Sequence, residues 1–173
     1  NIIWILTDDQ SDYSWQQAMP NVNSLLVQQG TTFLNSYVNF PVCDPARTSN
    51  LTGQAAHNTG VTMNGTEAFR RFRDLEPSML PTWLPAEYKT FFAGKLINQA
   101  GNDGVTDSTA YKPFGWTRTY ILKKLSYYSP AFIENGILVQ YGPDDYSTDI
   151  IATKAKNFIN QAAANNWPFV MIL

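Results

Sequence analysis

Two continuous apolar runs, Asn1–Leu6 and Pro168–Leu173, bracket the chain and constrain its fold most strongly. Continuous rather than alternating apolar runs are typical of parallel strands that are covered on both faces. A helix is expected before the second run, because Ser147 suits its start and apolar residues recur at three- and four-residue intervals from Ile151 to Ala162. Strand, amphipathic helix and strand make a β-α-β unit, so the sequence predicts an α/β fold.

Composition excludes several classes of protein. The chain has 173 residues, enough for a sizeable core, and its 44% apolar and 14% aromatic content indicates a globular protein. A net charge of −2 offers no basic patch for nucleic acid, and no apolar run reaches the roughly 18 residues of a membrane helix. We therefore expect one domain piece over residues 1–173 without an internal boundary, and neither a nucleic-acid nor a membrane partner.

Other stretches predict further elements. Pro20–Gly30 is expected to form a helix, Thr31–Phe40 a strand, and Gly60–Pro77 a polar, irregular surface segment. Asn64–Thr66, inside the last of these, is an N-glycosylation sequon. Thr90–Lys95 is expected to form a short buried strand that ends in a lysine.

The stretch Cys43–Gly53, which reads Cys-Asp-Pro-Ala-Arg-Thr-Ser-Asn-Leu-Thr-Gly, carries the strongest functional signal. Pro45 suits the first turn of a helix, Asp44 is expected to cap the helix start, and Gly53 its end. The side chain of Cys43 would then face the free N–H groups of a helix N-terminus, which attract anions. Arg47, one turn later, would offer a planar fork of donors to an oxyanion.

Each of these residue types also has an ordinary structural explanation. A lone cysteine such as Cys43 is usually a small buried hydrophobe, and a thiolate nucleophile there would lack a nearby general base. Asp8 and Asp9 follow a buried strand, where α/β sheets place ligands, but acidic pairs are often solvated. Lys95 could be a solvated charge, and His57, the single histidine, a hydrogen-bonded structural residue.

The stretch from Cys43 to Gly53 fits the sulfatase signature: Cys or Ser, any residue, Pro, Ser or Ala, Arg, four residues, and Thr-Gly. The chain therefore resembles the type I sulfatase family. Phe91–Asn98 is similar to the N-acetylglucosamine-6-sulfatase and fungal arylsulfatase branch. The resemblance implies an alkaline-phosphatase-like fold, with a mixed, mostly parallel sheet and helices on both faces. It also implies that this chain is the N-terminal portion of a longer sulfatase.

The family resemblance implies a role for each candidate residue. Cys43 would be oxidised to Cα-formylglycine by a formylglycine-generating enzyme; the hydrated aldehyde would attack sulfur with one hydroxyl and release sulfate with the other. Asp8 and Asp9 would hold Ca²⁺ together with residue 43. Arg47 would orient the nucleophile and Lys95 would bind the sulfate group.

The resemblance also implies two substrate-binding positions in this chain and three catalytic groups outside it. Many sulfatases carry a histidine where this chain has Ile97, and Asn98 is expected to bind substrate in its place. His57 is expected to border the substrate. An Asp-Asn pair, a second lysine and a leaving-group histidine would come from the remainder of the sulfatase chain.

The expected reaction is hydrolysis of a sulfated small molecule or a sulfated sugar by a secreted, lysosomal or periplasmic enzyme. Two alternatives stay open on the sequence. One is a phosphate or phosphonate ester hydrolase of the same superfamily. The other is a non-catalytic pseudo-sulfatase fragment in which Cys43 keeps its thiol.

Overall fold

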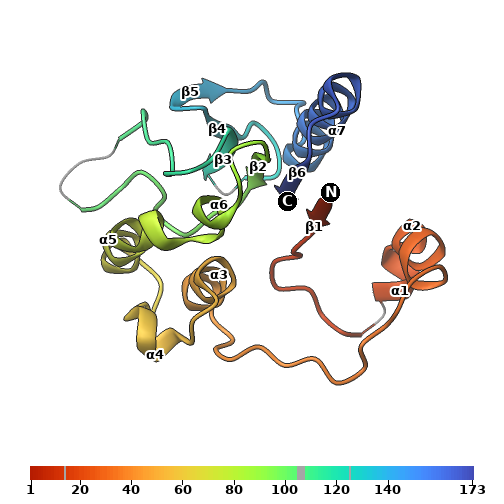
Figure 1. Cartoon of the computed structure of the whole chain (residues 1–173), viewed down its shortest axis with the longest axis horizontal. Helices are drawn as coiled ribbons and strands as arrows, with labels where there is room; N and C mark the ends of the chain where they lie inside the picture. Colours follow the sequence, from red (N-terminus) through yellow and green to blue (C-terminus); the bar gives the residue numbers. More distant parts are fainter. Residues whose placement is uncertain (14, 105–107, 125) are drawn as a thin grey trace. The chain divides into compact units, whose positions relative to one another are not determined.

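The computed structural model describes residues 1–13, 15–104, 108–124 and 126–173. These residues form two compact units (Figure 1). The first unit combines Asn1–Ile5 with Asn39–Leu173, and the second unit is Leu6–Val38. The first unit contains the sheet and most of the helices, and each unit is described separately below.

The first unit is built on a six-stranded sheet with the strand order β1-β6-β2-β3-β4-β5. Strands β1, β6, β2 and β3 run parallel, whereas β3, β4 and β5 are joined by antiparallel pairings. The sheet is therefore mixed, as expected. The strand bounds are β1 Ile2–Trp4, β2 Lys89–Gly94, β3 Arg118–Lys124, β4 Ala131–Glu134, β5 Ile137–Gln140 and β6 Phe169–Ile172.

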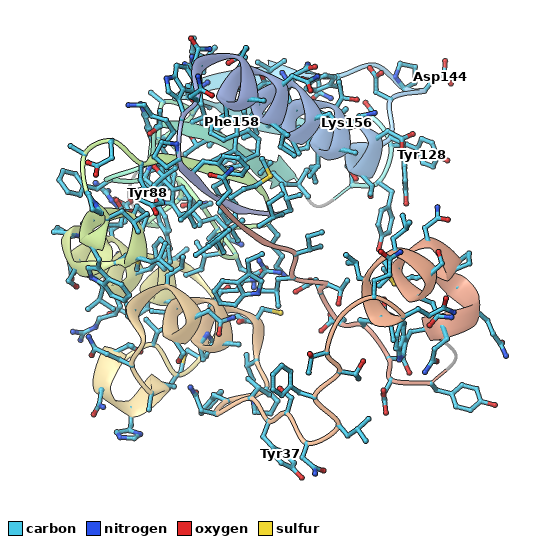
Figure 2. The ribbon with its side chains drawn as sticks, turned by 45° about the vertical axis from the view of Figure 1, so that its right-hand side comes forward. Tyr37, Tyr88, Tyr128, Asp144, Lys156 and Phe158 are labelled. Atoms are coloured by element: carbon cyan, nitrogen blue, oxygen red, sulfur yellow. The ribbon has the colours of Figure 1, made fainter. Side chains whose placement is uncertain are left out.

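Helix α7, Ser147–Asn165, covers one face of the sheet. Its buried side chains are spaced for one helical face, and Phe158 is one of them (Figure 2). Phe158 packs against Phe91 of β2 with ring centroids 4.8 Å apart. The helix ends at Asn166, whose φ of 53° is the left-handed conformation that asparagine tolerates best after glycine. The β-α-β unit predicted from the apolar pattern is confirmed.

The opposite face of the sheet is covered by the helical segment of residues 43–83. Because successive residues of a strand point to opposite faces, Phe92 of β2 leaves the α7 side and joins Leu51, Phe69 and Phe72 in a second core cluster. Helices on both faces make this an α/β fold, as the sequence predicts. These helices are α3 Cys43–Thr52, α4 Ala56–Thr59, α5 Thr66–Leu75, the 3₁₀ turn η2 Glu76–Ser78 and α6 Leu80–Trp83.

The expectation of an irregular Gly60–Pro77 segment is wrong. Helix α5 occupies most of it and buries Ala68, Phe69 and Phe72. Their spacing is that of one helical face, and the five charged residues of Thr66–Leu75 that obscure it lie on exposed positions.

The second unit is helical in its middle and irregular at its end. The expected Pro20–Gly30 helix is confirmed in part, by α2 Pro20–Val22 and the π-helical η1 Asn23–Val27; α1 Trp15–Ala18 precedes them. The strand expected over residues 31–40 is wrong, since these residues form no strand and Tyr37 is 89% exposed (Figure 2). Aromatic and β-branched residues favour a strand only where a neighbouring strand packs against them.

Among the described residues, no helix has both the length and the apolar character needed to cross a membrane.

The packing of β2 against α7 leads to a first prediction. Phe91 is completely buried, so Phe91→Ala in the full-length protein should lower the free energy of unfolding by about 3–5 kcal/mol through lost contacts and the cavity left behind. Phe114→Ala is the matched control, because the Phe114 side chain is 59% exposed and its loss should cost well under about 1 kcal/mol. Denaturant titration measures both values; equal losses would contradict this account of the core.

Candidate functional site

Helix α3 carries the sequence motif, and its two ends follow from local chemistry. The helix begins at Cys43, after Val42 in an extended conformation, and it ends at Gly53. Gly53 has a φ of 66° and donates its N–H to the carbonyl oxygen of Ser49, so the predicted glycine cap is confirmed. Cys43 is a free, half-buried cysteine in the first turn. Its side chain therefore lies at a helix N-terminus, as predicted.

Arg47 joins this helix to the end of strand β2. Its side chain is only 9% exposed, and Nη1 of the guanidinium donates a hydrogen bond to the carbonyl oxygen of Lys95. Lys95 is the residue that directly follows β2. The structure thus brings two of the predicted site residues, Arg47 and Lys95, into contact, and Cys43 lies one helical turn before Arg47.

Asp44 does not cap the helix, contrary to the sequence expectation. Its side chain is completely buried and accepts hydrogen bonds from segments distant in the chain. One carboxylate oxygen accepts from the backbone N–H and from Nδ2 of Asn98, both at 2.8 Å, and the other accepts from the backbone N–H of Gly65 at 3.2 Å. A cap would require Asp44 to precede the helix, but it is already the second helical residue.

Burial raises the pKa of the Asp44 carboxyl above its ordinary value. The hydrogen bonds from Asn98 and Gly65 and the positive charge of Lys95 oppose this rise without cancelling it. The hydrogen bonds from Asn98 thus connect the start of α3 with the segment after β2.

The cap of α3 comes from another loop. Oδ1 of Asn64 accepts a hydrogen bond from the backbone N–H of Asp44 at 2.9 Å and so satisfies one of the free N–H groups at the helix start. Asn64 lies 20 residues further along the chain, and the sequence marks it only as part of a glycosylation sequon. Local sequence patterns cannot detect a cap that a distant loop supplies.

Asn98 and His57 have different surroundings. Asn98 is half-buried and donates its side-chain amide to Asp44, while Ile97 beside it is 3% exposed and belongs to the core. Ile97 therefore offers nothing to a ligand at the position where the family resemblance places a histidine. His57 lies exposed in α4. Substrate contacts by Asn98 and His57 stay predictions.

Asp8 and Asp9 belong to the second unit. Both side chains are exposed, and one carboxylate oxygen of each lies within 4.8 Å of the other. Asp9 has a φ of 52°, in the left-handed region that aspartate tolerates better than most residues. Two adjacent carboxylates suit a hard cation such as Ca²⁺, which prefers oxygen ligands. Their metal role stays a prediction.

Comparison with known proteins is consistent with the motif. A family model described as Sulfatase matches residues 1–173. An N-acetylglucosamine-6-sulfatase of Homo sapiens is 32% identical over 184 residues, which cover all of this chain and 33% of the relative. An arylsulfatase of Volvox carteri is 32% identical over 180 residues, which cover 98% of this chain and 27% of the relative. The chain thus spans about a third of the length of these curated relatives.

A solved structure shares this fold. It is described as a complex with the substrate D-glucosamine-2-N,6-O-disulfate and superposes with a TM-score of 0.76 at 26% sequence identity. The match covers 99% of this chain and 33% of the other. The shared fold therefore extends over the whole of the chain described here.

The cap supplied by Asn64 leads to a second prediction. Asn64→Ala removes the acceptor for the Asp44 N–H and should lower the free energy of unfolding by about 1 kcal/mol, the usual cost of a lost helix cap. Thr66→Ala is the control, because it destroys the same glycosylation sequon but leaves the Asn64 amide in place. Chemical unfolding of both variants separates the effects, and equal losses would attribute the change to the glycan instead.

Proposed function

Since the chain belongs to the sulfatase family, we propose that the full-length protein hydrolyses sulfate esters and that residue 43 supplies the nucleophile. The observation that carries this proposal is the hydrogen bond from Arg47 to the Lys95 carbonyl oxygen. It joins the helix that begins at Cys43 to the strand end that carries Lys95. A nucleophile, a guanidinium and an ammonium on adjoining elements form a suitable binding site for an anionic ester.

The proposed nucleophile is residue 43 after oxidation to Cα-formylglycine by a formylglycine-generating enzyme. The hydrated aldehyde supplies one hydroxyl that attacks sulfur and a second that, once deprotonated, expels the sulfate. Lys95 neutralises charge on the transferring group, and Arg47 orients the side chain of residue 43. The positive end of the α3 helix dipole favours the same negative charge.

We further propose that Asp8, Asp9 and residue 43 hold Ca²⁺, which would polarise the nucleophile and the sulfate oxygens. Sheet register and chain connectivity support this assignment. Ile172 is the register partner of both Trp4 in β1 and Phe92 in β2, so these parallel strands end at the same edge. Lys95 follows Phe92 by three residues. Asp8 follows Ile5 by three residues, so chain length alone keeps their Cα atoms within about 11 Å.

The proposed substrate class is a sulfated sugar, and aryl sulfates would serve as simple assay substrates. The N-acetylglucosamine-6-sulfatase and the arylsulfatase among the relatives support this choice, as does the solved structure with a sulfated glucosamine. We also propose that the protein is secreted or lysosomal, which agrees with an exposed sequon at Asn64. Aryl phosphate assayed in parallel tests the alternative phosphate ester activity, and an unoxidised Cys43 would indicate a pseudo-sulfatase.

A third prediction tests the nucleophile. Cys43→Ser should transfer one sulfate group from a labelled ester to the serine hydroxyl and then stop, because one hydroxyl cannot both hold the sulfate and drive its release. The purified full-length variant should carry label on residue 43, detected by mass spectrometry of that peptide. Multiple turnovers by this variant would refute the proposed two-hydroxyl chemistry.

Removal of calcium should act differently in the same assay. Without a cation, the adjacent negative charges of Asp8 and Asp9 should repel an anionic substrate before any covalent step. The chelated Cys43→Ser variant should therefore trap no label, and added Ca²⁺ should restore trapping. Undiminished trapping after chelation would remove the metal from the proposal.

A fourth prediction concerns Arg47. Arg47→Lys keeps the positive charge but loses the planar fork that can donate to two oxygens at once. We expect kcat to fall on the order of 100-fold, the size of effect that follows from misplaced reacting groups. Unchanged formylglycine content, measured by mass spectrometry, is the control for incomplete oxidation. Near-normal turnover would show that Arg47 acts only as a general cation.

A further inference from the structure

We propose that Asp44 is a positioning residue: its buried carboxylate fixes the segment Lys95–Asn98 against the start of α3, and thereby sets Lys95 relative to residue 43. This inference rests on the sulfatase function proposed above. It concerns a position that the sulfatase signature leaves open to any residue and that lies between the proposed nucleophile and Pro45.

The contacts of Asp44 connect three parts of the chain. Its carboxylate accepts two hydrogen bonds from Asn98 and one from Gly65, and its own N–H donates to Asn64. Its carbonyl oxygen accepts from the Thr48 hydroxyl at 2.7 Å, within the helix. The helix start, the 64–65 loop and the segment after β2 therefore meet at one side chain.

Asp44 and Arg47 act as a pair on the segment after β2. They are three residues apart on α3, so they share one helix face. Arg47 holds the first residue of the segment through the Lys95 carbonyl oxygen, and Asp44 holds the last through Asn98. Leu96, between them, is 1% exposed and anchors the middle in the core. The backbone that carries Lys95 is thus fixed at both ends and in the centre.

A role in packing alone does not account for this carboxylate. Burying an ionised group is costly unless it is well hydrogen bonded, and an apolar side chain of similar size often stabilises a core as well or better. Three donors from two other segments instead define a specific relative position. Such a constraint matters where a displacement of about 1 Å between reacting groups costs on the order of 100-fold in rate.

The test uses the full-length enzyme with residue 43 oxidised. Asp44→Asn retains the size of the side chain but turns an amide donor toward the donors of Asn98 or Gly65, so at least one of the three hydrogen bonds is lost. Asp74→Asn is the matched control, because it removes the same charge from an exposed position in α5. For each variant the measurements are formylglycine content, kcat and KM on an aryl sulfate, and the Kd of inorganic sulfate.

A second pair of variants tests whether the interaction itself matters. Asn98→Asp places two carboxylates face to face and should be as damaging as Asp44→Asn. Combining Asp44→Asn with Asn98→Asp restores one amide–carboxylate pair with its direction reversed. We expect the double variant to recover at least 10-fold of the lost kcat, which simple loss of packing would not allow.

We expect Asp44→Asn to lower kcat on the order of 100-fold per formylglycine and to weaken sulfate binding, with Asp74→Asn unchanged. A loss that merely follows formylglycine content, or unchanged kcat and Kd, overturns the proposal. Hydrogen exchange of the peptide spanning residues 95–98 provides a readout independent of turnover. Exchange must be faster in Asp44→Asn; unchanged exchange also overturns the positioning role. If the wild type is inactive but exchange is still faster in Asp44→Asn than in the wild type, the sulfatase function is refuted and the positioning role is not.

Discussion

The hydrogen bonds between the first turns of α3 and the segment after β2 are the interaction on which the candidate site depends. Arg47 donates to the Lys95 carbonyl oxygen, and Asp44 accepts from Asn98. A helix alone would place Cys43 and Arg47 on one element, and a strand alone would place only Lys95. Only the contact between the two elements brings the proposed nucleophile, Cys43, and the cations of Arg47 and Lys95 to the same edge of the sheet.

The sheet makes this contact durable. Strand β2 lies between β6 and β3 and is buried on both faces, by α7 on one side and by the α3–α5 layer on the other. Its carboxyl end is therefore among the best-packed parts of the first unit. Polar groups placed there operate from a rigid support, and the hydrogen-bond geometry around Lys95 and Asn98 can be held closely.

The sequence predicts the parts of the fold whose signals are local. Apolar runs predict β1, β2 and β6, and a period of three to four residues predicts α7. The failures occurred where tertiary contacts decide. Residues 31–40 have the composition of a strand without a neighbouring strand, and α5 is amphipathic but rich in charge. The motif predicted the helix at Cys43 because proline and glycine mark its ends.

For the site, the sequence predicts the candidate residues but not the hydrogen bonds that position them. Arg47 and Lys95 were identified from the motif and its resemblance, and the structure brings them into contact. The sequence does not predict the roles of Asp44 and Asn64, because their hydrogen-bond partners lie 20 to 54 residues away. Hydrogen bonds over such separations follow from tertiary packing, and no periodic pattern in the sequence signals them.

The sulfatase signature allows any residue at position 44, and this has a physical consequence. The fixed positions of the motif carry the proposed nucleophile and the proposed catalytic arginine, whereas the residue at position 44 points into the protein and meets Asn98 and Gly65. A carboxylate there requires donors on the facing segments; a different residue would require different partners. Position 44 and position 98 should therefore change together among sulfatases, because a carboxylate at the buried position 44 without its amide at the half-buried position 98 would lose two hydrogen bonds.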